Sequence, residues 1–357
     1  GPPAPAAAKR KPPDGELSTT ESGPIMFGPL LGDTVNGCWE TSSYSRSPRT
    51  SALPLVSSRS EPMIRPPSPE KMPPNGMELT SWGNECNARE NPIPVFAEMG
   101  SVNPIFVMEG YLADRMDAAA AAYASSLSLG VGQFCTNPGL IFVPRSQEET
   151  FAAAVVDQLK EVAGAPMLHE GICHTYYQAL ETLTQSKKLK WLLHSEETDV
   201  LTGNVALAKI KASDWLADEA FQEEVFGPFG IMVVYEDRDQ LHALAEKLKG
   251  QLTCTIWAEE EELQSSGALL HLIEEKCGRL LFKGVPTGVE VGHAMQHGGP
   301  FPATTDSRST SVGSYAIKRF ARPVAYQDMP DSLLPEALKE GNPMAILRKV
   351  DGVWVNY

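Results

Sequence analysis

The residues of this chain that could do chemistry stand in two short sequence words. Residues 132–139 read GQFCTNPG and place Cys135 in a loop bounded by glycines, just before the apolar run Leu140–Val143. Residues 96–104 read FAEMGSVNP and place Glu98 directly after an apolar stretch. A thiolate can attack a carbonyl carbon, and a carboxylate can activate the water that later releases the product. The two words therefore favour nucleophilic attack on a carbonyl followed by hydrolysis.

Two further words make a family resemblance specific. Residues 223–228 read EEVFGP, and residues 297–313 form a glycine-rich run that begins HGGP. With the first two words, they resemble the aldehyde dehydrogenase superfamily, most closely its 2,5-dioxopentanoate (α-ketoglutarate semialdehyde) dehydrogenases. The similarity starts near Asn87 and runs almost to Tyr357. It covers about three quarters of the chain and only the catalytic half of that family.

The resemblance implies a role for each residue of these words. Cys135 would attack the aldehyde carbon, lose a hydride to a nicotinamide ring and become a thioester. Glu98 would be the general base for thioester hydrolysis, with a pKa raised by its apolar neighbours. Glu224 would bind the hydroxyls of the nicotinamide ribose, and Phe226 would pack beside the nicotinamide ring. Judged from the residues alone, the cysteine could equally be a small core residue and both glutamates solvated.

The glycine-rich run would form the substrate side of the site. His297 and Arg308 are polar candidates for binding a substrate carboxylate, because an arginine can hold that group through two parallel hydrogen bonds. Arg308 could instead only connect loops. His293 and His297 are spaced as metal ligands on a helix can be, but no other ligand completes a site, so no metal is expected.

Composition limits the other classes of function. The net charge is −15 and the sequence has no basic stripe, which argues against binding of nucleic acid. No run of 18 apolar residues and no secretion signal are present, so we expect no membrane segment and a cytoplasmic protein. The six cysteines have no CxxC spacing, which favours reduced thiols.

Three regions follow from the composition along the chain. Residues 1–88 are rich in proline and serine, with 15 of the 29 prolines in the first 90 positions, and are expected to be disordered. Residues 89–320 are expected to form an α/β catalytic domain, and residues 321–357 an oligomerisation strand and tail. The strand would be residues 322–327, which resemble the family segment that pairs with a partner subunit, so a homo-oligomer is expected.

Apolar runs and helical periodicity alternate after residue 88, which predicts a mostly parallel sheet covered on both faces. The expected strands are residues 93–97, 105–108, 140–143, 231–235, 254–257 and 280–282. The expected helices are residues 114–127, 147–162, 174–183, 215–224, 238–248 and 259–275. In the second of these helices, Phe151, Val155, Leu159 and Val162 share one face.

The first 90 residues do not read as the dinucleotide-binding domain that complete family members carry, so we expect a truncated or rearranged chain. NAD and NADP cannot be distinguished for the same reason. Three functions remain open. The first is NAD(P)-dependent oxidation of a small-molecule aldehyde, which the resemblance implies to be oxidation of 2,5-dioxopentanoate to 2-oxoglutarate. The second is a cofactor-independent esterase that uses the Cys135 thiol and Glu98. The third is an inactive fragment that pairs with full-length subunits.

Overall fold

The computed structural model describes residues 86–194 and 196–356. The expected disorder of residues 1–88 falls almost wholly outside these described residues. The central sheet has seven strands, which in chain order are β1 (Ile105–Val107), β2 (Leu140–Pro144), β4 (Lys190–Leu193), β6 (Ala206–Lys211), β7 (Phe229–Tyr235), β8 (Gln251–Trp257) and β9 (Cys277–Phe282).

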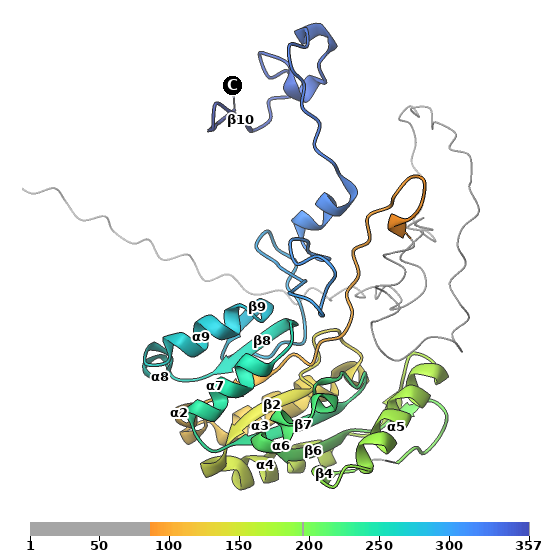
Figure 1. Ribbon diagram of the computed structural model, residues 1–357, viewed down its shortest axis with the longest axis vertical. Helices are drawn as coiled ribbons and strands as arrows, with labels where there is room; N and C mark the ends of the chain where they lie inside the picture. The colour runs from red at the N-terminus through yellow and green to blue at the C-terminus, as the bar shows by residue number, and fades with distance from the viewer. Residues whose placement is uncertain (1–85, 195, 357) are drawn as a thin grey trace, which may run out of the picture. The chain divides into compact units, whose positions relative to one another are not determined.

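The strands lie in the order β4-β6-β7-β2-β1-β8-β9, which Figure 1 follows from β4 at one end to β9 at the other. All neighbours are parallel except β4 and β6, which are antiparallel. The predicted mostly parallel sheet is therefore confirmed. Two small antiparallel pairs accompany it, β3 (Ala165–Pro166) with β5 (Thr202–Gly203) and β10 (Arg348–Val350) with β11 (Val353–Val355).

Helices cover both faces of this sheet. The α-helices are α2 (Glu109–Ala113), α3 (Met116–Ser128), α4 (Glu148–Lys160), α5 (Glu170–Thr184), α6 (Ala212–Leu216), α7 (Arg238–Lys247), α8 (Glu260–Gln264) and α9 (Gly267–Glu274). Alternate residues of β1 point to opposite faces: Ile105 and Val107 join the apolar cluster of α3 and α4, and Phe106 joins the cluster of α5, α6, α7 and α9. Each face of the sheet thus has its own core.

The face of α4 that packs on the sheet has the predicted spacing of apolar residues. Phe151, Val155 and Leu159 are buried against the sheet, whereas Val162 lies just beyond the end of the helix and is partly buried. Burying such a side chain contributes about 1.5–3 kcal/mol, so this stripe alone fixes α4 on the sheet.

Several expected elements were wrong in position or type. Residues 93–97 form no strand, because backbone bonds from this segment go to a distant loop rather than to a neighbouring strand. The expected helix 259–275 divides into α8 and α9 around Ser265 and Ser266. Strand β6 was missed because its alanines, leucine and lysines are residues that favour helix.

Candidate active site

The predicted site residues meet at one edge of the sheet. Parallel strands present their amino ends on the same side, and β1, β2 and β7 begin at Ile105, Leu140 and Phe229. The segments that enter these strands carry Glu98, Cys135 and Glu224, respectively. The fold therefore gathers residues that are up to about 125 positions apart in the chain.

Cys135 lies in a tight loop between the 3₁₀ helix η2 (Leu129–Gly132) and β2. Gly132 has φ +65°, and a Cβ there would lie 2.2 Å from the backbone carbon of Gly227. Only glycine satisfies both conditions without strain. Asn137, just beyond the cysteine, also donates its side-chain amide to the Gly227 carbonyl at 3.1 Å. The cysteine loop and the segment that carries Glu224 and Phe226 are thus packed backbone to backbone.

A buried polar network holds the cysteine loop from the other side. The side-chain amide of Asn103 donates to the carbonyls of Cys135 and Asn137 at 2.9 and 3.0 Å. The oxygen of the Gln251 side chain, at the start of β8, accepts from the backbone N–H groups of Val102 and Asn103 at 2.8 and 3.1 Å. Because hydrogen-bonded buried polar groups rigidify their surroundings, this network holds the backbone of the Cys135 loop in place.

Glu98 reaches the site through a short antiparallel contact with the glycine-rich run. Met99 donates its backbone N–H to the Ala303 carbonyl at 2.8 Å, and Thr305 donates to the Ala97 carbonyl at 3.0 Å. These bonds flank Glu98 and turn its side chain toward residues 297–311. They also explain why the apolar residues before Glu98 do not join the sheet.

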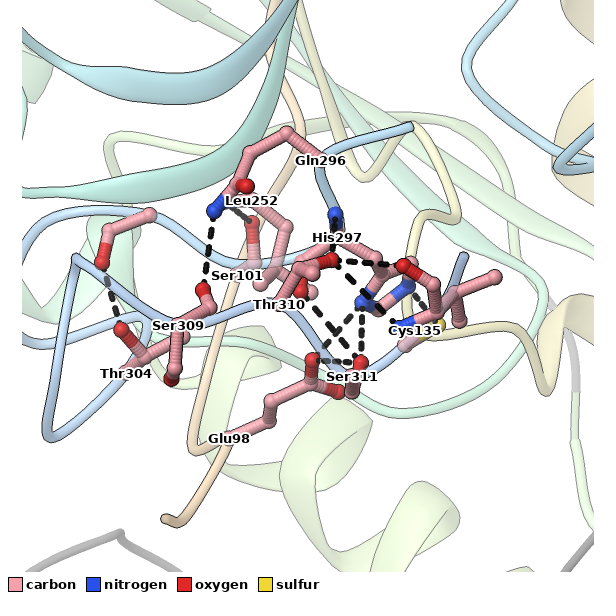
Figure 2. Close-up of polar contacts among 12 residues, drawn as sticks. Glu98, Ser101, Cys135, Leu252, Gln296, His297, Thr304, Ser309, Thr310 and Ser311 are labelled. Atoms are coloured by element: carbon pink, nitrogen blue, oxygen red, sulfur yellow. Dashed lines mark hydrogen bonds and ion pairs between the residues drawn. The ribbon is translucent and has the colours of Figure 1, made fainter. Parts of the chain in front are cut away.

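His297 joins the thiol to the carboxylate. Its Nε2 lies 3.0 Å from Cys135 Sγ, and its Nδ1 lies 2.7 Å from Glu98 Oε1. Figure 2 shows the imidazole between the sulfur and the carboxylate, with the Ser311 hydroxyl bonded to Glu98 and 3.0 Å from Nδ1. The His297 side chain is only 4% exposed. The residues form a Cys-His-Glu triad in which the histidine is buried and the cysteine and glutamate are partly exposed.

The electrostatics of the triad differ from the sequence prediction. Burial alone would raise the pKa of Glu98, but the hydrogen bond and positive charge of His297, together with Ser311 and Arg319, lower it below its ordinary value. The expected raised pKa of Glu98 is therefore wrong. Burial would lower the pKa of His297, but its bonds with Cys135 and Glu98 raise it to about 10. The prediction from sequence took account only of the apolar residues next to Glu98. It did not include His297, a cationic partner 199 positions away.

Glu224 lies in a different environment. It stands outside the expected helix 215–224, because α6 ends at Leu216 and a 3₁₀ helix, η4 (Glu219–Gln222), also ends before it. Its Oε2 accepts one bond, 3.3 Å long, from the Ser101 backbone N–H, and burial raises its pKa to about 8. It borders a cavity of about 20 Å³ together with Phe226, which is space for about one water molecule.

Arg308 lies on the surface of the glycine-rich run. Its guanidinium is 88% exposed and forms a two-pronged pair with Asp306 at 2.9 and 2.8 Å. A cavity of about 450 Å³ lies beside it, and its basic residues Arg308, Lys318 and Arg319 outnumber the single acid Asp306. The structure thus places Arg308 next to a cationic cavity, and places His297 against the thiol rather than in that cavity.

Sequence reasoning missed several residues of the site. Asn103 and Gln251 carry the network beneath Cys135, and Ser311 binds Glu98. His297 was noticed, but its contacts with both reactive groups were not foreseen. An asparagine directly before Pro104 was the available signal for the first, because asparagine tolerates the positive φ (46°) that Asn103 adopts.

Comparisons with known proteins show the family of this chain. The model of the aldehyde dehydrogenase family matches residues 84–268, more than half of the chain. This chain belongs to the aldehyde dehydrogenase family. The resemblance noted in the sequence is confirmed.

Two curated relatives are similar over three quarters of the chain. Alpha-ketoglutaric semialdehyde dehydrogenase 2 of Azospirillum brasilense is 45% identical over 270 residues, which cover 75% of this chain and 51% of that protein. Alpha-ketoglutaric semialdehyde dehydrogenase of Acinetobacter baylyi is 43% identical over 273 residues, covering 76% and 52%. The chain spans about half the length of these relatives.

Solved structures share the fold at lower identity. The aldehyde dehydrogenase KauB from Pseudomonas aeruginosa matches with a TM-score of 0.56 and 18% identity, covering 69% of this chain and 48% of that one. An NAD+ complex of an aldehyde dehydrogenase from Bacillus cereus matches with a TM-score of 0.55 and 17% identity, with the same coverage. These likenesses concern the fold of the sheet and its helices.

The described part of the chain contains neither a helix suited to a membrane nor a group of side chains suited to a metal ion. No helix within residues 86–194 or 196–356 has both the length and the apolar character needed to cross a bilayer. Over the same ranges, no three His, Cys, Asp or Glu side chains are grouped so that they could hold a metal ion. The cysteines of these ranges are free thiols, whereas Cys38 lies outside them.

Proposed function

We propose that the site oxidises an aldehyde to a carboxylic acid, with Cys135 as the nucleophile. The observation that carries the proposal is the 3.0 Å contact between Cys135 Sγ and the buried His297, in a chain of the aldehyde dehydrogenase family. Attack forms the C–S bond of a thiohemiacetal, loss of hydride gives a thioester, and water then cleaves the C–S bond. Such chemistry needs a fixed sulfur, which the network beneath Cys135 provides.

The hydride acceptor would be NAD or NADP, held by Glu224 and Phe226. A carboxylate can accept hydrogen bonds from both ribose hydroxyls, and an aromatic ring can pack beside nicotinamide, so the chemistry of these side chains fits. To bind the ribose, the Glu224 carboxylate would exchange its contact with the Ser101 backbone N–H for the ribose hydroxyls. When bound, the nicotinamide would supply the two-electron acceptor. Glu224 and Phe226 would orient it toward Cys135.

The proposed substrate is 2,5-dioxopentanoate, and the product 2-oxoglutarate. The two curated relatives described above, at 45% and 43% identity, are named as α-ketoglutaric semialdehyde dehydrogenases. The cationic cavity supports an anionic substrate, because Arg308, Lys318 and Arg319 line it beside Phe96 and Gln296, which directly precede or flank the triad residues. A carboxylate would bind there while the aldehyde faces the sulfur.

The protein would act as a homo-oligomer in the cytoplasm. Residues 322–327, the proposed pairing segment, form no strand within the described chain and expose Val324 and Tyr326. An apolar segment of this kind could be covered by the sheet edge of a second subunit. Gel filtration with light scattering measures the assembly directly, and a monomer at micromolar concentration would contradict it.

A second function has its own supporting observation. A thiol, an imidazole and a carboxylate in line are the arrangement of cysteine hydrolases, which need no cofactor. The 2.7 Å bond from Glu98 to His297 completes that line. Cofactor-independent hydrolysis of thiol-reactive esters is therefore the alternative to aldehyde oxidation.

One assay set tests both functions on the purified full chain. NADH or NADPH formation with 2,5-dioxopentanoate is measured by the absorbance of the reduced nicotinamide ring. Hydrolysis of p-nitrophenyl acetate is measured in parallel. Cys135→Ala should abolish both activities, and Cys86→Ala serves as the matched control on an unrelated free thiol.

The outcomes separate the two functions. Cysteine-dependent cofactor reduction supports aldehyde oxidation, and ester hydrolysis without cofactor reduction supports the hydrolase instead. Activity that survives in Cys135→Ala would contradict both.

A further inference from the structure

The cavity of about 450 Å³ shares part of its lining with the triad. Thr310, which lines the cavity, accepts the backbone N–H of His297 through its hydroxyl at 2.8 Å. Arg319, which also lines it, donates from Nη2 to the Ser311 carbonyl at 3.4 Å. Figure 2 shows Thr310 and Ser311 close to His297 and Cys135. A molecule bound in the cavity would therefore lie beside the reactive side chains.

Two of the three basic side chains of the cavity are already engaged or free to move. The Arg308 guanidinium forms two hydrogen bonds with Asp306, so its charge is compensated and its donors are partly used. Lys318 is exposed, and its Nζ lies 4.2 Å from the centre of the Tyr315 ring. A lysine ammonium is a hydrated point charge on a flexible stem. Neither side chain offers the cavity a donor that is both fixed and free.

Arg319 is in a different state from these two residues. Its side chain is partly buried, and its Nε is a buried atom without a hydrogen-bond partner. The Ser311 carbonyl is its hydrogen-bond acceptor, and Cζ lies 5.6 Å from the centre of the Phe320 ring. No ion pair within residues 86–194 and 196–356 includes it, although its charge contributes to the lowered pKa of Glu98. A partly buried guanidinium without an acid is the group to which an anion would bind.

The rest of the lining suits the carbon chain of a small anion. Phe96 and Tyr315 contribute aromatic rings, against which methylene groups can pack. The Gln296 amide donates to the Ser309 carbonyl at 2.8 Å, so this donor is engaged within the protein. Arg319 is therefore the fixed donor that the cavity offers to a carboxylate.

We propose that Arg319 is the specificity-determining residue that binds the substrate carboxylate, so that the site selects aldehydes that carry a carboxylate over neutral aldehydes. This inference rests on the proposed function and deepens it. The two terminal nitrogens of a guanidinium can hold both oxygens of a carboxylate through parallel hydrogen bonds, an arrangement that a lysine cannot reproduce. Arg308 adds charge at the exposed side of the cavity, and its effect is smaller because its donors already bind Asp306.

The test is protection of Cys135 from alkylation by iodoacetamide, followed at the Cys135 peptide of the full chain by mass spectrometry. Glutarate, an unreactive dicarboxylate, should slow alkylation of the wild type, whereas pentane-1,5-diol of the same length should not. In Arg319→Gln, the glutarate concentration that gives half protection should rise about 100-fold, and in Arg319→Lys about tenfold, because lysine keeps the charge without the planar pair of donors. Arg238→Gln is the matched control and should follow the wild type, because this exposed arginine begins α7 at the opposite edge of the sheet.

The contact of Arg319 with the Ser311 carbonyl needs its own control. Without glutarate, alkylation of Arg319→Gln should stay within about twofold of the wild-type rate. A changed rate with an unchanged half-protecting concentration would reduce Arg319 to a structural partner of Ser311 and overturn the proposal. Protection by the diol as strong as that by glutarate, or by sulfate at equal ionic strength, would overturn it as well. Circular dichroism confirms that each variant is folded, and Arg319→Lys keeps the test decisive if Arg319→Gln is not.

Steady-state kinetics separate this inference from the proposed function. In Arg319→Gln, KM for 2,5-dioxopentanoate should rise about 100-fold, while KM for butanal, a neutral aldehyde, stays within about twofold. Aldehyde oxidation with the same ratio of the two KM values in wild type and variant would remove the role of Arg319 and leave the proposed function intact. Glutarate protection that depends on Arg319, without any reduction of cofactor, would instead contradict the proposed function and leave the carboxylate site intact.

Discussion

Two glutamates at the same edge of the sheet have opposite electrostatics. Glu98 lies against a cationic imidazole and a hydroxyl, and its pKa is lowered. Glu224 has one backbone N–H as its partner, and burial raises its pKa to about 8. Both are glutamates with the same ordinary pKa, so the difference comes from the partners that the fold supplies. At neutral pH the first is ionised and the second is largely protonated.

A third carboxyl, that of Glu148, lies outside the site and shows that a lowered pKa does not by itself identify a reactive group. The Glu148 side chain is 5% exposed at the start of α4 and pairs with Arg145 and Lys209. Burial would raise its pKa, but Lys209 and Arg145 lower it. Its electrostatics match those of Glu98, yet its carboxylate is bonded to a guanidinium and an ammonium rather than to an imidazole in contact with a thiol. A lowered pKa therefore marks a cationic partner, and only the additional sulfur marks Glu98 as part of a reactive site.

The largest expected effect comes from Gly132. At this residue the loop that carries Cys135 packs against the backbone of the segment that carries Glu224. Gly132→Ala would place a methyl group 2.2 Å from the Gly227 backbone in a region of φ that alanine disfavours. We expect a loss of about 2–5 kcal/mol in the free energy of unfolding and a displaced Cys135 loop. Urea unfolding measures the first, and iodoacetamide labelling the second.

Gly267→Ala is the control for that change. Gly267 begins α9, and a Cβ there would meet no atom within 4 Å. Alanine should stabilise the protein by about 0.5–1 kcal/mol, because glycine loses more backbone entropy in a helix. Equal losses in both variants would mean that the close approach of Gly132 to Gly227 is not a constraint.

Replacement of the structural carboxyl should have the next largest effect. Glu148→Gln leaves Lys209 and Arg145 without their acid, and we expect a loss of about 2–3 kcal/mol at pH 7. Because the folded pKa of Glu148 is lowered, its contribution exists above the ordinary value of 4.5 and is lost as the pH falls through the folded value. The free energy of unfolding of the variant, measured with a chemical denaturant, should therefore lie below that of the wild type at pH 7. The difference between the two proteins should be smaller near pH 3. Unchanged alkylation of Cys135 would confirm that this carboxyl is outside the reactive site.

The sheet was largely predictable from the sequence, and the reason is local. Buried strands such as Leu140–Pro144 and Phe229–Tyr235 are apolar on both faces, so composition alone reveals them. Strand β6 failed this test because Lys209 and Lys211 interrupt its apolar residues. Residues 93–97, before Glu98, were wrongly predicted as a strand. An apolar run indicates burial, but it does not indicate which backbone the segment bonds to.

The site was predictable as a set of residues and not as a network. Family words identified Cys135, Glu98 and Glu224 as candidates, and the fold brings them to one edge. The bridge by His297 depends on contacts across 162 and 199 positions, which no local pattern encodes. The error about the pKa of Glu98 has the same origin, since a charge partner is a property of the folded chain.

The comparison of the two glutamates predicts a smaller, pH-dependent effect at Glu224. Its folded pKa of about 8 lies above its ordinary 4.5, so the folded state holds the proton more tightly, and stability falls as the pH rises between these values. Glu224→Gln should match the wild type at pH 4 and be more stable by about 1–2 kcal/mol at pH 9. This figure is reduced from about 1.4 kcal/mol per pKa unit because the side chain is partly exposed. A deficit at pH 9 in thermal unfolding would show that the carboxylate is stabilised by a partner.

Arg308 should give the smallest change in stability and thereby test what an exposed charge is for. Its pair with Asp306 is 88% exposed on the arginine side, and exposed pairs of this kind contribute little to stability. Arg308→Ala should therefore leave the unfolding midpoint nearly unchanged. If the cationic cavity binds the substrate carboxylate, the same variant should raise KM for 2,5-dioxopentanoate about tenfold while leaving kcat and the KM of an uncharged aldehyde within about twofold. Equal changes for both aldehydes would place the arginine among loop contacts and not in substrate binding, because only an anionic substrate can lose a charge-assisted bond.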